Sequence, residues 1–200
     1  CYIGLRGDGM RIAVFVDGAN VFHMQKKHLG WAIDLKKLLE YFKQYGEVVD
    51  AYFYTAIDET KEDQKKFLQM LPYLGYSIVS KPLKVIRDGD MIYHKGNLDI
   101  EIVLDMFNTI DNYDMAVLVS GDGDFERALC QLRARGKQFL VVSSAKTVAR
   151  EILAVAGIRY LDVASIEAQV RLTTVPKPLL EIGDINAILE DMSVESDFPV

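Results

Sequence analysis

Four carboxylates stand at positions where they could act together on a divalent cation. Asp17 follows the apolar run 12–16, Asp122 and Asp124 are separated by a single glycine, and Asp99 lies between these two places in the chain. Several carboxylates in a small volume repel one another, so they stay ionised together only when a cation neutralises them. Oxygen ligation, without Cys or His at zinc-site spacing, predicts Mg²⁺ or Mn²⁺ rather than Zn²⁺.

The glycine-rich acidic segment 120–125, SGDGDF, matches none of the other common motifs of similar composition. An EF-hand loop has glycine at its sixth position, where this chain has Arg127. A dinucleotide-binding fingerprint has a third glycine, where this chain has Glu126. A P-loop continues into GK[ST], which is absent from the sequence here. The two glycines do allow a tight bend that turns both carboxylates toward one point.

Each of these acids also has a purely structural interpretation. Asp17, Asp122 and Asp124 could simply cap the helices that follow them. Asp99, in the first turn of a predicted helix, would interact favourably with the helix dipole in any case. Two strands that both end in acids, together with a flexible acidic turn, favour a shared site over four separate caps.

Two further acids lie close to Asp99 in the sequence. Asp105 follows it by six residues, which places it about 9 Å along a helix axis and about 120° around it. The two cannot easily bind one ion, so Asp105 is expected to support the site or to pair with a base. Glu101 shares the helix face of Asp105, and we expect it to be solvated.

The elements that must position these acids alternate along the chain between buried strands and helices. Continuous apolar runs predict strands over 11–17, 48–56, 114–120, 138–143 and 158–162. Helices are predicted over 19–29, 35–45, 60–74, 124–135 and 147–156, with another that Asn97 begins. This order predicts an α/β fold, a three-layer α/β/α sandwich with a mainly parallel sheet. Functional residues in such folds gather just beyond the carboxyl ends of the strands.

One segment breaks the alternation and the two ends of the chain lie outside it. Apolar runs on both sides of Asp88-Gly89 predict a β-hairpin within 77–94. Residues 1–10 are expected to be a disordered leader, 11–170 the domain, and 171–200 an acidic linker and tail. An amphipathic patch in the tail could dock on the domain as a short helix: Ile182, Ile185, Ile188 and Leu189.

Composition and charge exclude several classes of protein. The sequence has 200 residues, 50% of them hydrophobic and 26% charged, which is typical of a globular protein. The net charge of −6 lies mostly in residues 176–200, so the near-neutral body is not a strongly basic nucleic-acid binder. No run is long and apolar enough to span a bilayer. Two cysteines and no apolar leader predict a cytoplasmic protein without disulfides.

Three segments together resemble the signature blocks of a known family. They are 15–20, FVDGAN; 95–99, KGNLD; and 120–125, SGDGDF. In this order they resemble the NYN domain, and within it the LabA-like branch of the PIN-like nuclease superfamily, over about residues 11–165. The resemblance implies a PIN-like fold and a metal-dependent ribonuclease site.

The same resemblance implies roles for individual residues. Four acids match the family's catalytic metal ligands: Asp17, Asp99, Asp122 and Asp124. Asn20 matches the polar partner of the first acid, and Ser120 matches the hydroxyl before the acidic turn. Lys95 is a candidate contact for a substrate phosphate.

The resulting hypothesis is a cytoplasmic nuclease that hydrolyses RNA, single-stranded or structured, with one or two Mg²⁺ or Mn²⁺ ions. A metal held by the acids would activate a water and neutralise charge on the scissile phosphate. The alternative is a LabA-like regulatory or RNA-binding protein with little or no catalysis. A homodimer or a protein partner is compatible with both. An aspartyl phosphatase ranks third, because Asp17-Gly18-Ala19 lacks the second aspartate of its DxDx[TV] motif.

Overall fold

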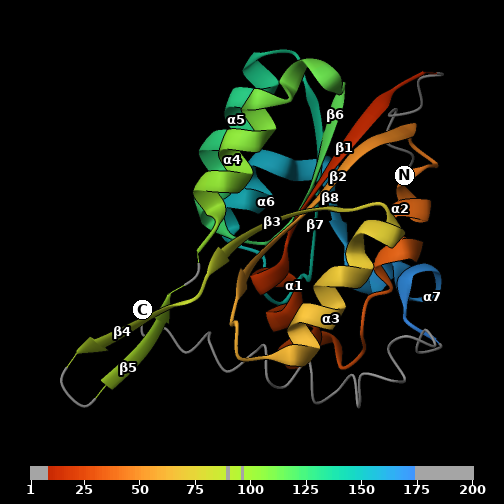
Figure 1. Cartoon of the computed structure of the whole chain (residues 1–200). Helices are drawn as coiled ribbons and strands as arrows, with labels where there is room; N and C mark the ends of the chain where they lie inside the picture. Colours follow the sequence, from red (N-terminus) through yellow and green to blue (C-terminus); the bar gives the residue numbers. More distant parts are fainter. Residues whose placement is uncertain (1–8, 89–90, 96, 174–200) are drawn as a thin grey trace.

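Six parallel strands form the central sheet of this protein, in the order β3-β2-β1-β6-β7-β8 (Figure 1). The computed structural model describes residues 9–88, 91–95 and 97–173. The strands are β1 (Arg11–Asp17), β2 (Glu47–Ile57), β3 (Ser77–Pro82), β6 (Met115–Val119), β7 (Gln138–Ser143) and β8 (Tyr160–Asp162). The parallel sheet confirms the predicted fold class.

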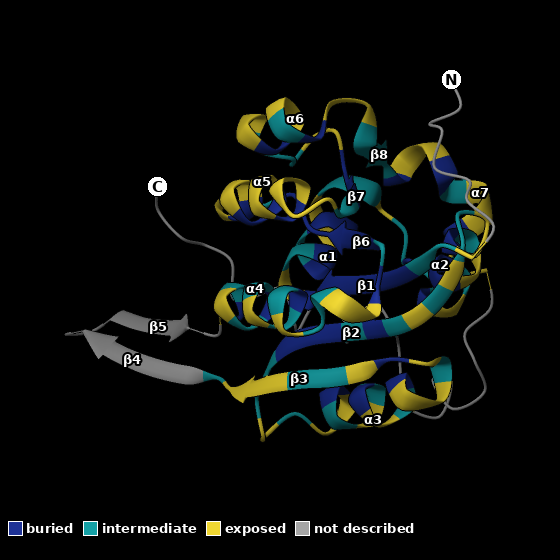
Figure 2. Cartoon of the chain, turned by 90° about the horizontal axis from the view of Figure 1, so that it is seen from above, coloured by how far each residue is buried: buried dark blue, intermediate teal, exposed yellow. Residues whose placement is uncertain are grey.

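Helices cover both faces of the sheet and make the fold three-layered (Figure 2). They are α1 (Gly18–Met24), α2 (Leu35–Phe42), α3 (Glu62–Met70), α4 (Asp99–Asn108), α5 (Glu126–Ala134), α6 (Arg150–Ala156) and α7 (Glu167–Val170). One apolar cluster joins the sheet to α1, α2, α3 and α7. A second cluster joins the opposite face to α4, α5 and α6.

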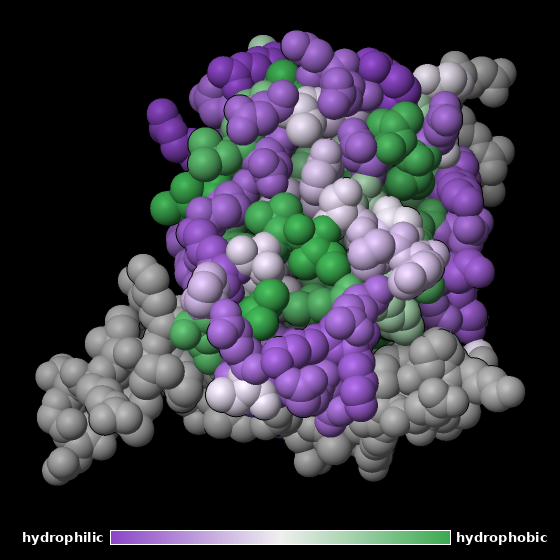
Figure 3. Space-filling view, viewed as in Figure 1, coloured by the Kyte–Doolittle hydropathy of each residue, from purple (hydrophilic) through white to green (hydrophobic). Residues whose placement is uncertain are grey.

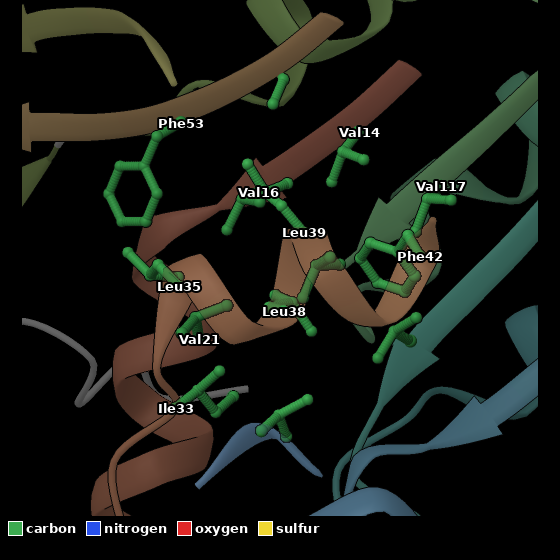
Figure 4. Close-up of a cluster of buried hydrophobic side chains, with 14 of the residues drawn as sticks. Val14, Val16, Val21, Ile33, Leu35, Leu38, Leu39, Phe42, Phe53 and Val117 are labelled. Carbon is green, nitrogen blue, oxygen red and sulfur yellow. The ribbon is translucent and has the colours of Figure 1, made fainter. Parts of the chain in front are cut away.

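The core is centred on β1 and β6, which lie side by side in the middle of the sheet. Alternate side chains of β1 enter the two clusters, as the period of two in a strand requires. Val14 and Val16 pack with Phe42 of α2 on one face, as Figure 4 shows. Ala13 and Phe15 enter the cluster on the other face. Burial on both faces explains why these strands read as uninterrupted apolar runs.

The predicted hairpin is confined to a shorter segment than expected. Antiparallel strands β4 (Lys84–Asp88) and β5 (Met91–Lys95) form a separate two-stranded sheet. Residues 77–82 instead extend the main sheet, as the parallel edge strand β3. Pro82 ends this strand, because proline has no N–H to donate to a sheet ladder.

A strap near the end of the described chain holds α7 against the rest of the domain. Arg171 forms a β-bridge with Ile33, and the Asp34 N–H donates to the Val170 carbonyl at 2.8 Å. Lys37 Nζ donates to Thr173 Oγ1 at 2.9 Å. Residues 1–8 of the predicted leader and 174–200 of the predicted tail lie outside the described residues. None of the described helices is long and apolar enough to cross a membrane.

Removing residues 176–200 should leave the domain as stable as the full chain. The strap closes by Thr173, so a chain ending at Val175 keeps the strap contacts described above. We expect the melting temperature to change by no more than about 2 °C, as for surface changes elsewhere. Circular dichroism melting measures this.

A shorter chain ending at Glu167 serves as the control. It loses the fully buried Val170 and the bridge at Arg171, and it should lose at least about 2 kcal/mol of stability. An insoluble or molten chain ending at Val175 would instead show that the apolar patch of the tail completes the core.

Candidate acidic site at the carboxyl edge of the sheet

Five neighbouring strands carry a polar residue at the same level, near or at their carboxyl ends. The register of the sheet pairs Tyr54 of β2 with Asp17 of β1, and Ser143 of β7 with Asp162 of β8. Ser120 directly follows Val119 of β6, which pairs with Val16 on one side and with Val142 on the other. Ser120 therefore stands at the level of Asp17 and Ser143. The rest of the sheet centre is apolar and buried. This row is therefore where the sheet can present chemistry to a ligand.

Asp17 lies at the centre of the row and is almost completely buried, with 8% of its surface exposed. Its Oδ1 accepts a hydrogen bond from the Asn20 N–H at 3.1 Å, so it caps α1. Its Oδ2 accepts a hydrogen bond from Ser120 Oγ at 2.9 Å. The capping role and the site role are thus filled by different oxygens of one carboxylate.

Two hydrogen bonds attach the acidic turn after β6 to the start of α1, and a third lies within the turn. The Ser120 hydroxyl bridges Asp17 and the Asp122 N–H, from which it accepts at 3.2 Å. Asn20 Oδ1 accepts a hydrogen bond from the Gly121 N–H at 3.1 Å. Gly121 lies so close to β7 that a Cβ there would meet Ser143 Oγ at 2.5 Å. The polar neighbours of Asp17 therefore hold the turn in place.

The other three acids surround this centre with increasing exposure to solvent. Asp99 is half-buried at the start of α4, where its N–H donates to Asn97 Oδ1 at 2.7 Å. Asp122 is also half-buried, and its Oδ1 accepts a hydrogen bond from the Asp124 N–H at 2.9 Å. Asp124 is exposed.

Burial and mutual repulsion perturb the two least exposed acids. Burial raises the pKa of Asp17 to about 6, and the hydrogen bonds from Asn20 and Ser120 oppose this rise. The charges of Asp99 and Asp122 raise it further. Burial also raises the pKa of Asp99 above its ordinary value, with added repulsion from neighbouring acids. The carboxylates of the site thus repel one another electrostatically.

The donor set suits a hard divalent cation. All four candidate ligands are carboxylates, which Mg²⁺ and Mn²⁺ prefer, and a cation would relieve the repulsion between them. Among the described residues, however, no three His, Cys, Asp or Glu side chains stand close enough to hold an ion.

Two contacts near the site link α4 to β2 and to the edge strand β3, and neither was predicted from the sequence. Tyr54 Oη donates to Asp105 Oδ2 at 3.0 Å. Lys81 of β3 forms an ion pair with Glu101. Glu101 is therefore not solvated as expected, and its second carboxylate oxygen is buried without a hydrogen-bond partner. Both pairs anchor the helix that carries Asp99.

Two other polar residues complete the description of the site. Ser143 is fully buried against the acidic turn, and its hydroxyl has no hydrogen-bond partner among the described residues. Lys95, the candidate phosphate contact, lies in β5, and its side chain is outside the described part of the chain.

Substituting Gly18 with alanine should destabilise the junction between Asp17 and α1. A Cβ at Gly18 would lie 2.6 Å from the Tyr54 carbonyl oxygen, which belongs to the rigid β2 backbone. We expect a loss of about 1–3 kcal/mol in urea unfolding, the usual cost of overpacking a core. Gly30→Ala is a useful comparison, because it meets no atom within 4 Å and is strained only by its φ of +71°. If Gly18→Ala is as stable as the wild type, the backbone of β2 or α1 can shift to make room for the Cβ at little cost.

Comparison with known proteins gives consistent matches over most of the chain. The NYN domain family matches residues 11–164. The low amplitude and bright protein LabA of Synechococcus elongatus is 43% identical over 175 residues, covering 85% of this chain and 92% of LabA. A crystal structure of a protein of unknown function from Vibrio parahaemolyticus is similar with a TM-score of 0.70 and 26% identity. That match covers 82% of this chain and 97% of the other.

Proposed function

We propose that this chain, which belongs to the NYN domain family and is LabA-like, is a metal-dependent ribonuclease that hydrolyses RNA phosphodiester bonds. NYN domains form part of a nuclease-like superfamily, and the chain carries the acids that such chemistry needs. The observation that carries the proposal is the burial of Asp17 in electrostatic contact with Asp99 and Asp122. A fold that needed only helix caps would not bury one carboxylate beside two others.

The proposed ligands of the metal are the four acids of the site: Asp17, Asp99, Asp122 and Asp124. A bound Mg²⁺ or Mn²⁺ supplies activation of water and neutralisation of charge on the scissile phosphate. Ser120 and Asn20 hold the acidic turn against Asp17 through the hydrogen bonds described above. We propose that Asn20 also contacts the phosphate, as does Lys95. In-line attack on the phosphorus leaves a 3′-hydroxyl and a 5′-phosphate.

Cleavage of a mixed RNA pool tests the proposal directly. The purified protein should cut RNA when Mn²⁺ or Mg²⁺ is present and should leave it whole in EDTA. The fragments should carry 5′-phosphates, which a 5′-phosphate-dependent exonuclease would then degrade.

We also propose a cytoplasmic location, on the two cysteines and the lack of a predicted membrane span noted in the sequence.

A regulatory protein with the same fold is the second candidate function. It is favoured by the 43% identity to LabA, whose name describes a phenotype rather than an activity, and by the lack of a preassembled ligand group among the described residues. A wild-type protein that binds RNA without cutting it under any metal condition would establish this alternative. A protein that neither binds nor cuts RNA would point to a protein partner instead.

A further inference from the structure

We propose that a single strand of RNA approaches the acidic site along the outer surface of α1 and the π-helical turn that follows it, Gln25–Leu29. Four side chains define this surface, which we call the basic stripe: His23, Lys26, Lys27 and His28. The inference rests on the proposed function and adds to it the surface that holds the substrate.

Charge is the first argument for the basic stripe. Residues 18–33 contain its four basic residues and no Asp or Glu, in a chain with a net charge of −6. Lys26 and Lys27 are exposed, and His23 and His28 are partly exposed. A phosphate backbone binds by pairing with cations such as Lys26 and Lys27, even where the whole protein is acidic.

Position is the second argument. Because α1 begins directly after Asp17, the helix that carries the stripe starts at the site (Figure 1), and His23 lies about 9 Å along its axis. Asn20, His23 and Lys27 follow one another at intervals of three and four residues, so they share one side of the helix. Asn20 contacts the acidic turn at Gly121, which fixes the end of this side at the site. Lys26 lies about 14 Å along the helix axis from Asp17, a span of a few nucleotides.

The π-helical turn and the residue after it supply aromatic surface. The turn brings the rings of His23 and His28 to a centroid distance of 5.7 Å. Gly30 ends the turn with φ of +71°, and the partly exposed Trp31 follows against the core cluster. Unpaired bases stack on aromatic rings, whereas bases in a duplex are not available to do so. These rings therefore favour a single strand.

Salt-dependent binding distinguishes this path from any other. The variant Lys26→Ala/Lys27→Ala is compared with the wild type, using a labelled single-stranded RNA 12-mer in EDTA so that no cutting occurs. The plot of log affinity against log salt should become shallower by about 1.4, since each lost phosphate contact on a single strand contributes about 0.7. At 0.15 M salt this corresponds to about tenfold weaker binding. Trp31, the one tryptophan in the sequence, should lose fluorescence when RNA binds.

The matched control is Lys36→Ala/Lys43→Ala, in α2 and at its C-cap, which removes the same charge from two exposed positions outside the basic stripe. It should bind RNA as the wild type does. In cleavage assays the stripe variant should raise KM and leave kcat unchanged. Equal salt dependence in both variants would overturn the inference while leaving the proposed nuclease intact. Wild-type protein that binds no RNA would overturn both, and tighter binding of duplex RNA would overturn the preference for a single strand.

Figure 3 shows that the face seen in the view of Figure 1 is largely polar, with apolar side chains between α4 and α3. Ile100 and Leu104 of α4 are among the exposed large apolar residues, with 70% and 53% of their surface accessible.

Discussion

Replacing Asp124 with alanine should lower the rate of RNA cleavage by about 10²–10³-fold or more, the usual effect of removing one electrostatic stabiliser of a transition state. Asp124 is exposed, so its loss should not disturb the core. RNA affinity should change much less, because phosphate contacts with basic side chains supply most of the binding. Initial rates with Mn²⁺, and binding in EDTA, measure the two effects separately.

Glu126→Ala is the matched control for this prediction. Glu126 is an exposed acid two residues further on, at the start of α5, and its loss changes the net charge by the same amount. It should retain the wild-type rate. If Asp124→Ala and Glu126→Ala cut RNA equally well, the acidic turn has no part in catalysis and the metal ligands must lie elsewhere.

Replacing Asp17 with asparagine should stabilise the metal-free protein at neutral pH. Burial raises the pKa of Asp17 from 3.8 to about 6, so the folded state favours the protonated carboxyl. Stability from this group is fully present below about pH 4 and is lost as pH rises through 6. The loss amounts to about 3 kcal/mol as an order of magnitude. Asparagine has no charge to bury, and its Oδ1 can still accept a hydrogen bond from the Asn20 N–H. Its side-chain NH₂ can donate to Ser120 Oγ, which donates to Asp17 in the wild type.

Urea unfolding in EDTA between pH 4 and pH 8 measures this effect. Wild-type stability should fall across the range by more than that of Asp17→Asn. The more exposed Asp122→Asn serves as the control and should gain less. Mn²⁺ should then stabilise the wild type at pH 7 through binding, and it should not stabilise Asp17→Asn. Equal stabilisation of both by Mn²⁺ would show that Asp17 is not a ligand.

The strands and helices of this fold could be predicted because local patterns and tertiary burial agree. The run 12–16 is apolar on both sides of β1, since helices cover both faces of the sheet. The strands within 77–94 are harder to predict from the sequence, because the apolar residues there suit an edge strand and a hairpin equally well. Residues 77–82 join the main sheet because they pair with β2, whose first paired residue lies 25 positions earlier, and Pro82 ends this pairing.

The acids of the site were also visible in the sequence, because strand ends and glycine turns mark where a parallel sheet places its ligands. The supporting contacts were not visible. Tyr54 reads as a core aromatic, and nothing local indicates that its hydroxyl meets Asp105 on α4. Glu101 reads as a solvated helix residue, until the position of Lys81 at the end of β3 is known. Both depend on how α4 packs across the sheet edge.

The link between Asp17 and Ser120 has a consequence for the chain during its synthesis. These residues are 103 positions apart, and β1 pairs with β6 only after everything between them has been made. Proteins emerge from the ribosome with the N-terminal part first, and contacts of long range close last. A nascent chain that has exposed Asp17 therefore still lacks the acidic turn, and the proposed nuclease cannot be active until well over half of it has left the ribosome.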